Sequence, residues 1–300
     1  MTLNRILVLA AIYCAGVGAA AQISKLIPVL GAVQEWYDVT LPAATLLVSV
    51  IGAGGLVFGM VVGDLVVRAG LARSLAAAAF VALAAGLALT FAPTFPALGA
   101  IRVLESTAHL VVVTAAPGLM SRIAPAEHRT TVLAIWASFF GVAFVASQAL
   151  AATGFASAAP ATFLRVHVIL FVPFILALAL APLRGALRDE RRDRSIGRGL
   201  PPLAAYVPIR LDAGGLAALS FACHSGTTTA LLTLFPGEAA LRYGLRPEAV
   251  ALLSVSLPVV WLIATLGASA VLRRSSATTA LVAGCVIVLI ALAIPGTWPA

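Results

Sequence analysis

The sequence predicts an all-α integral membrane protein, and three observations support this fold class. Of the 300 residues, 62% are hydrophobic and only 10% are charged, whereas soluble domains carry about 25% charged residues. The mean hydropathy is +1.09. The apolar residues gather into runs of about 20, the length that a helix needs to cross the hydrocarbon layer of a bilayer. This composition excludes a soluble enzyme, a disordered chain and a disulfide-stabilised scaffold.

Nine apolar runs are candidate membrane-spanning helices. Turn-forming residues separate several of them, for example Pro93 after the third run and Pro236 after the seventh. The runs are 6–30, 41–62, 75–92, 97–119, 131–153, 165–183, 212–234, 249–271 and 277–294.

The first run also has features of a secretory signal. Arg5 precedes an apolar stretch that contains Ala19-Ala20-Ala21, which matches a small-residue cleavage site. The apolar sequence continues past this point to Leu30, and eight further runs follow. We therefore expect a first transmembrane helix rather than a cleaved signal.

The basic residues predict the orientation of the chain. With the N-terminus inside, 14 of the 19 Lys and Arg residues lie in cytoplasmic segments and three lie on the opposite side. Such a bias indicates a multi-pass protein of the cytoplasmic (inner) membrane with a cytoplasmic N-terminus. The formal charge of +8 thus reflects topology, and we expect the lipid bilayer, not nucleic acid, to be the partner of these residues.

The longest polar stretch divides the chain. Residues 184–210 follow the sixth run and contain a basic segment, 188–194, and a Pro-Pro pair. We expect a six-helix bundle over 1–183, a cytoplasmic linker over 184–210 and a partial bundle over 211–300. The basic segment is also a candidate contact for anionic lipid headgroups, although its interleaved acidic residues weaken that attraction.

The cysteines give no sign of a metal or redox site. Cys14, Cys223 and Cys285 all lie within apolar runs and have no metal-ligand spacing. We interpret them as small packing residues, and we expect no cofactor and no metal.

A few polar side chains lie within the apolar runs, where ionisable groups are costly and usually functional. They cluster in runs one, four and seven, and those of a single run share a helical face, because residues three, four or seven apart are neighbours on a helix. They are Gln22 and Lys25; Arg102, Glu105 and His109; and His224.

A glycine-rich segment after the second run predicts a tight cytoplasmic turn. Small residues let two helices approach closely, and an aspartate there can pair with a nearby arginine or cap a helix. The residues of this segment are Gly59, Gly63, Asp64, Arg68, Gly70 and Arg73.

This segment closely resembles the signature loop between helices 2 and 3 of the major facilitator superfamily. Arg102, Glu105 and Ser106 are similar to a second motif of that family, with Ser in place of its Gly, and residues 116–129 resemble its loop between helices 4 and 5. The resemblance covers about the first 200 residues. It implies two six-helix halves built from three-helix inverted units, with the helices of runs one, four and seven lining a central cavity.

The length departs from that pattern. Nine runs fall short of the family's twelve helices, and the missing three would need roughly 90 residues. The counterpart of the signature turn in the second half keeps Gly267, Arg273 and Arg274 but lacks the aspartate. We therefore expect a family member that is truncated after about nine helices.

The resemblance and the buried charges together suggest a secondary active transporter of a small, anionic solute, coupled to protons by alternating access. Gln22, Lys25, Arg102 and His224 are the candidate substrate-binding residues, and Glu105 and His109 the candidate proton carriers. Structural roles remain open for several of these residues: Lys25 could extend to the outer interface, Arg102 and Glu105 could form an internal ion pair, and His224 could only pack.

Two other functions remain open. One is a membrane sensor or partner-binding protein that has the fold without transport, and measured solute flux would distinguish it. The other, less favoured, is a membrane-embedded transferase, an enzyme that would need a catalytic cluster near one membrane face. Glu127 and His128 adjoin one another there, but nothing else in the sequence converges on them.

Overall fold

The structure, a computed structural model, describes residues 1–180, 231–232 and 234–272, which form helices and their connections without any strand. Six helical segments in this part of the chain are long and apolar enough to cross a membrane, and a bent pair within α3 (Leu41–Ala69) makes a seventh. These segments correspond to the predicted runs one to six and eight. The predicted all-α membrane fold is confirmed, while the run 277–294 and nearly all of 212–234 lie outside the described residues.

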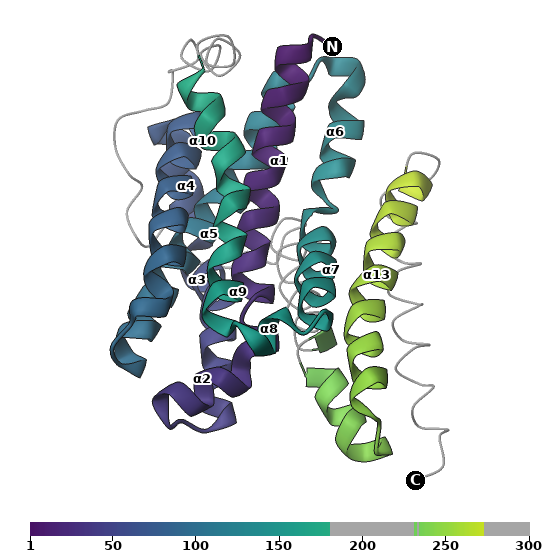
Figure 1. Ribbon diagram of the computed structural model, residues 1–300. Helices are drawn as coiled ribbons and strands as arrows, with labels where there is room; N and C mark the ends of the chain where they lie inside the picture. The colour runs from purple at the N-terminus through teal and green to yellow at the C-terminus, as the bar shows by residue number, and fades with distance from the viewer. Residues whose placement is uncertain (181–230, 233, 273–300) are drawn as a thin grey trace.

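Helix α1 (Leu3–Ser24) lies in the middle of the first bundle (Figure 1). It packs against α5 (Phe95–Ile123), α7 (Phe139–Ala152) and α10 (Val172–Ala179). Helix α5 in turn packs against α3 and against α4 (Leu71–Ala88), which continues into the short helix η2 (Leu89–Phe91). The two helices that carry most of the predicted polar residues, α1 and α5, are therefore direct neighbours.

Helices α3 and α5 begin in the same way. The hydroxyl oxygen of Thr40 accepts a hydrogen bond from the backbone N–H of Ala43, and that of Thr94 accepts one from Ala97. Each helix also has a proline in its first turn, where a missing N–H costs nothing. The caps satisfy donors that a helix start leaves without partners.

The first span is broken where the sequence predicted one continuous run. Helix α1 ends at Ser24, and the chain continues through η1 (Ile27–Val29) and α2 (Leu30–Tyr37). Pro28 accounts for the break, since it cannot donate to the carbonyl four residues earlier and its ring collides with that carbonyl. The break places Lys25 at the end of α1, inside the protein.

The sixth span is broken in a similar way. The short helices α8 (Phe155–Ala158) and α9 (Pro160–Val166) lead into the 3-10 segment η4 (His167–Phe171), and α10 follows with Pro173 in its first turn. This proline again removes a helical donor. The break puts His167 at the junction of α9 and η4.

The fifth span has a milder break. It consists of η3 (Ala126–His128), α6 (Arg129–Trp136) and α7. Between α6 and α7, the hydroxyl of Ser138 donates to the carbonyl oxygen of Ile135 at 2.7 Å, a local bond that competes with regular helix geometry.

The interior of the bundle has a polar layer between two apolar clusters. Along α5, Leu98 belongs to one cluster and Val112 to the other, and the buried Arg102, Glu105 and Ser106 lie between them. Buried polar groups must find their hydrogen-bond partners within the protein. The partners of this polar layer therefore show which helices it joins.

Helix α13 (Pro247–Leu272) packs against α7 beside the first bundle (Figure 1). The Trp261 ring meets those of Phe140 and Phe144 at centroid distances of 5.3 and 6.3 Å. Gly141 allows the close approach, since a Cβ there would lie 3.1 Å from the side chain of Leu262.

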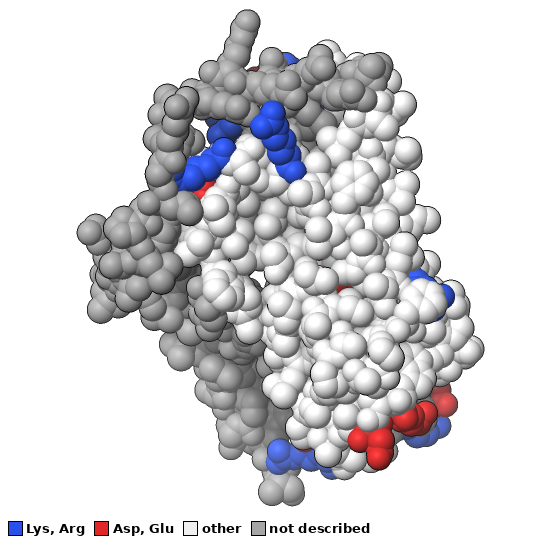
Figure 2. Space-filling view, turned by 90° about the vertical axis from the view of Figure 1, so that its left-hand side faces the viewer, with Lys and Arg blue, Asp and Glu red and all other residues white. Residues whose placement is uncertain are grey.

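Charged side chains gather toward the two ends of the face in Figure 2, and a broad band between them is almost entirely uncharged. Such a band is the surface that the hydrocarbon of a bilayer requires. The predicted linker 184–210 lies outside the described residues, so the division of the chain stays a prediction.

Candidate functional site

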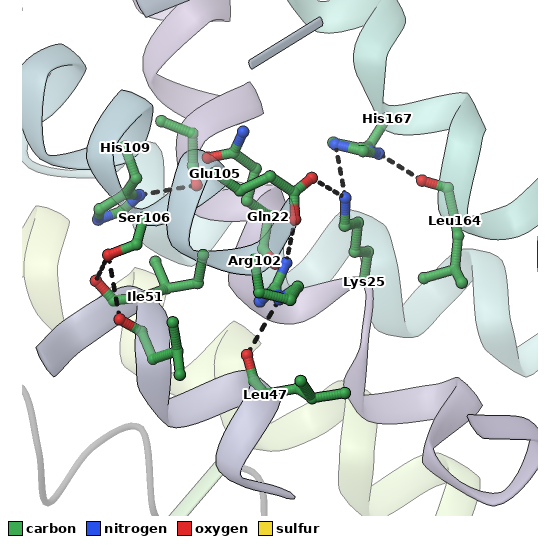
Figure 3. Close-up of polar contacts among 12 residues, drawn as sticks. Gln22, Lys25, Leu47, Ile51, Arg102, Glu105, Ser106, His109, Leu164 and His167 are labelled. Carbon is green, nitrogen blue, oxygen red and sulfur yellow. Dashed lines mark hydrogen bonds and ion pairs between the residues drawn. The ribbon is translucent and has the colours of Figure 1, made fainter. Parts of the chain in front are cut away.

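Lys25, Arg102 and Glu105 form one buried charge cluster (Figure 3). The ammonium Nζ of Lys25 lies 2.5 Å from Oε1 of Glu105, and the guanidinium Nη1 of Arg102 donates to Oε2 of the same carboxylate. The three side chains are between 0% and 1% exposed. Glu105 is therefore the shared counter-ion of two cations, one on each oxygen.

Arg102 also connects three helices. Its Nε donates to the carbonyl oxygen of Leu47 in α3 at 3.0 Å, and its Nη1 donates to the carbonyl oxygen of Gln22 in α1 at 2.8 Å. Charge-assisted bonds of this kind are stronger than neutral ones, so the guanidinium is held in one position. The predicted ion pair between Arg102 and Glu105 is formed, and Lys25 does not extend to the outer interface.

His167 joins the cluster from η4. Its Nε2 lies 3.1 Å from Nζ of Lys25, and its Nδ1 lies 2.7 Å from the carbonyl oxygen of Leu164. Because a carbonyl can only accept, Nδ1 carries the proton, and Nε2 of the neutral ring accepts from the Lys25 ammonium. The sequence pattern does not single out His167, since it lies at the edge of the run 165–183, where a polar residue is ordinary.

Glycine at position 86 makes room for this histidine. A Cβ at Gly86 of α4 would lie 3.2 Å from Nε2 of His167 and 2.6 Å from a methyl group of Val168. The lack of a side chain therefore allows η4 to lie against α4 with its histidine turned toward Lys25.

The cluster carries an uncompensated charge. Two cations face one carboxylate, which leaves one positive charge when His167 is neutral. Removing ions from water costs several kcal/mol each, and a pair offsets this cost only if it is balanced and well bonded. The cluster therefore leaves an excess of positive charge in the interior of the protein.

Two groups beside the cluster have no hydrogen-bond partner. They are the side-chain amide of Gln22, through both Nε2 and Oε1, and Nη2 of Arg102. Gln22 is fully buried, so water at the surface of the protein does not reach it.

The two other predicted histidines differ in position. His109 donates from Nδ1 to the carbonyl oxygen of Ala19 at 2.8 Å and is only partly buried. It thus joins α5 to α1 one turn beyond Glu105, without a hydrogen bond to that carboxylate. His224 lies outside the described residues.

Ser106, which departs from the family motif, has a clear role. Its hydroxyl lies 3.0 and 3.1 Å from the carbonyl oxygens of Val50 and Ile51 in α3. A Cβ at Gly54 would lie 2.4 Å from that hydroxyl. The glycine that allows α3 and α5 to approach therefore stands on α3, and the hydroxyl on α5 fills the space.

The signature turn is short and contains an ion pair. Nε of Arg68 lies 2.7 Å from Oδ2 of Asp64 on the same helix, and both side chains are partly exposed. Gly70 joins α3 to α4 at φ 97°, a conformation that residues with a Cβ avoid, and Arg73 is exposed on α4. At Gly59 and Gly63 a Cβ would meet no described atom within 4 Å, so the expected close helix approach is not made there to the described residues.

The comparison with known families decides the identity of the fold. The family model of the Major Facilitator Superfamily matches residues 9–299. The chain belongs to this superfamily. No curated protein matches the chain.

Membership of the superfamily establishes the general activity. Its members are membrane transporters for small molecules rather than enzymes, and the chain is accordingly a multi-pass transporter of this kind. Among the described residues, no three His, Cys, Asp or Glu side chains are grouped so that they could hold a metal ion. The site of interest is thus the polar layer between α1, α3, α5 and η4.

Proposed function

We propose that the protein is a secondary active transporter that moves a small anionic solute across the cytoplasmic membrane by alternating access, coupled to a proton gradient. The observation that supports an anion is the positive excess of the buried charge cluster, in which Lys25 and Arg102 share the single carboxylate of Glu105. A solute with one negative charge would neutralise the site. A neutral solute would leave the excess in place, and a cation would add to it.

The position of Glu105 supports proton coupling. Both of its oxygens are engaged by cations, so protonation of the carboxylate would weaken two ion pairs at once and free Lys25 and Arg102 for a solute. His167 supplies a second proton acceptor, since Nε2 lies 3.1 Å from Nζ of Lys25. Glu105 is the primary proton carrier in this scheme, and His109 is a secondary candidate because its bond runs to Ala19.

The orientation and the two halves complete the proposal. The N-terminus is cytoplasmic, residues 1–183 and 211–300 form the two bundles, and 184–210 joins them. In this arrangement, α13 belongs to the second bundle, and its Trp261 contacts the rings of Phe140 and Phe144 in the first. The two bundles would move against each other along this contact.

Uptake into proteoliposomes tests the proposal. The full chain is reconstituted, a proton gradient directed inward is imposed, and the accumulation of a panel of labelled small anions is measured. We expect Lys25→Met and Arg102→Met to reduce uptake of the transported anion at least tenfold, the factor that about 1.4 kcal/mol of binding free energy represents. Arg165→Met is the control, because this arginine contacts Thr90 and Phe91 instead of the cluster.

The two parts of the proposal can fail separately. Unchanged uptake of every anion in both cluster variants would refute the role of the buried cations. Full proton-driven accumulation by Glu105→Gln would refute the role of Glu105 in coupling, even if the anion remained the substrate.

A further inference from the structure

The hydroxyl of Ser24, the last residue of α1, is bonded twice to α7. Its oxygen lies 2.7 Å from the hydroxyl oxygen of Ser147 and 3.3 Å from the carbonyl oxygen of Ala143. Because a carbonyl can only accept, Ser24 donates its single proton to Ala143 and accepts from Ser147. The Ser24 side chain is fully buried, and its two partners lie four residues apart, about one turn of α7. Ser24 is therefore anchored to a single turn of the neighbouring helix.

The end of α1 lacks part of its backbone bonding. In a continuing helix, residue 28 would donate to the carbonyl of Ser24, but this residue is a proline and has no N–H. Helix ends fray where such bonds are missing. The side-chain bonds of Ser24 thus give the last turn of α1 an attachment that its backbone does not supply.

Small residues bring the two helices close enough for this anchor. Ala20 and Ala21 of α1 and Ala143 of α7 belong to one buried apolar cluster, and small side chains let helix backbones approach closely. The bond from Ser24 to a backbone carbonyl requires such an approach. The position of the end of α1 is therefore set by its contact with α7.

Lys25 follows Ser24 directly and joins this anchor to the buried charge cluster (Figure 3). Its ammonium Nζ lies 2.5 Å from Oε1 of Glu105 and 3.1 Å from Nε2 of His167. A lysine stem is flexible, and at 1% exposure this side chain has little access to water at the protein surface. The place of its ammonium between the two partners therefore depends on where the helix end is held.

We propose that Ser24 is a positioning residue of transport, whose bonds to α7 hold the Lys25 ammonium between Glu105 and His167. This inference rests on the proposed function, in which Lys25 binds the anion. Loss of the anchor lowers the fraction of molecules in which Lys25 is in place, and the apparent affinity for the solute falls with that fraction. Ser24 acts through Lys25 and does not touch the solute itself.

Transport kinetics distinguish this role from a contribution to stability alone. Proteoliposomes that contain the full chain are tested with labelled acetate, lactate and inorganic phosphate, and the anion with the highest uptake serves as the probe. Ser24→Ala should raise the KM of uptake about fivefold, the factor that one net hydrogen bond represents, without lowering the maximum rate per folded molecule. Loss of stability alone would reduce the amount of active protein, and hence the maximum rate, at an unchanged KM.

Tyr13→Phe is the matched control. It removes another hydroxyl–hydroxyl bond of α1, the 2.8 Å contact between Tyr13 and Ser138, about three turns before Ser24. This variant should leave KM unchanged. Ser147→Ala should raise KM less than Ser24→Ala does, because the bond to Ala143 remains. Ser147→Thr keeps the hydroxyl at a half-buried position and should restore the KM of the wild type.

A double-mutant cycle of unfolding temperatures tests the link to Lys25 without any solute. Ser24→Ala should lower the unfolding temperature of the wild type by a few degrees. It should lower that of Lys25→Met clearly less, because the ion pair that the anchor holds in place is already lost. Tyr13→Phe should lower the unfolding temperature of both proteins by the same amount.

The inference and the proposed function fail on different measurements. An unchanged KM in Ser24→Ala, or equal losses of unfolding temperature in the wild type and in Lys25→Met, would overturn the role of Ser24 and leave an anion transporter. Uptake of neutral or cationic solutes in place of all anions would overturn the proposed function. The unfolding temperatures would then still decide whether Ser24 positions Lys25.

Discussion

Nζ of Lys25 and Oε1 of Glu105 lie 2.5 Å apart although 80 residues separate them in the sequence. Their contact joins the end of α1 to the middle of α5, at the level where the first span breaks. Since Glu105 also holds Arg102, the carboxylate is the centre of the polar layer. Its removal should affect the protein more than removal of either cation's charge.

The first prediction concerns stability. Glu105→Gln leaves two buried cations without a counter-ion, which should lower the free energy of unfolding by about 3–5 kcal/mol. Lys25→Met leaves a neutral pair of Arg102 and Glu105, so it should lower the free energy of unfolding clearly less than Glu105→Gln does. Thermal unfolding of the purified variants in detergent measures the order of their stabilities. A Glu105→Gln variant more stable than Lys25→Met would contradict a cluster with excess positive charge.

The sequence predicted the membrane fold and most of this cluster, because helical spacing alone places Gln22 with Lys25 and Arg102 with Glu105. The contact between the two pairs depends on how α1 packs against α5, which spacing within one helix does not encode. The breaks at Lys25 and His167 were missed, since Pro28 and Pro173 lie inside apolar runs that read as uniform. His167 could be found only from the structure, where η4 turns it toward Lys25.

The second prediction concerns the packing of α3 against α5. Gly54→Ala would place a Cβ 2.4 Å from the hydroxyl of Ser106, and overpacking of this kind costs about 1–3 kcal/mol of unfolding free energy. Ser106→Ala removes the hydroxyl and leaves its Cβ at 3.7 Å from the new methyl group, an ordinary contact. The double variant should therefore be more stable than Gly54→Ala alone.

A double-mutant cycle of unfolding temperatures measures this coupling. Strictly additive effects of the two substitutions would show that Ser106 does not limit the space at Gly54. Gly99→Ala in α5 is the control, because a Cβ there meets no described atom within 4 Å.

The third prediction separates the two histidines near the cluster. His167→Asn should reduce proton-driven accumulation of the substrate several-fold while substrate exchange without a gradient continues, because the acceptor beside Lys25 is altered and the anion-binding cations remain. His109→Asn should change the ratio of driven uptake to exchange less than His167→Asn does, since His109 bonds to Ala19 and not to Glu105. The pH dependence of both activities in each variant is the measurement. A change of this ratio in His109→Asn alone would show that His109, and not His167, takes part in proton coupling.

The fourth prediction tests whether His167 acts through its position against α4. Gly86→Ala would bring a methyl group within 2.6 Å of Val168 and 3.1 Å of the His167 ring, so these neighbours must shift. We expect this shift to lengthen the 3.1 Å contact between His167 and Lys25. Gly86→Ala should therefore reduce proton-driven accumulation as His167→Asn does, with exchange preserved. The two substitutions together should have no more effect than His167→Asn alone, because both act on the same contact. If the losses of accumulation in the two single variants added fully in the double variant, Gly86 and His167 would act independently. The space at Gly86 would then not be what directs the histidine toward Lys25.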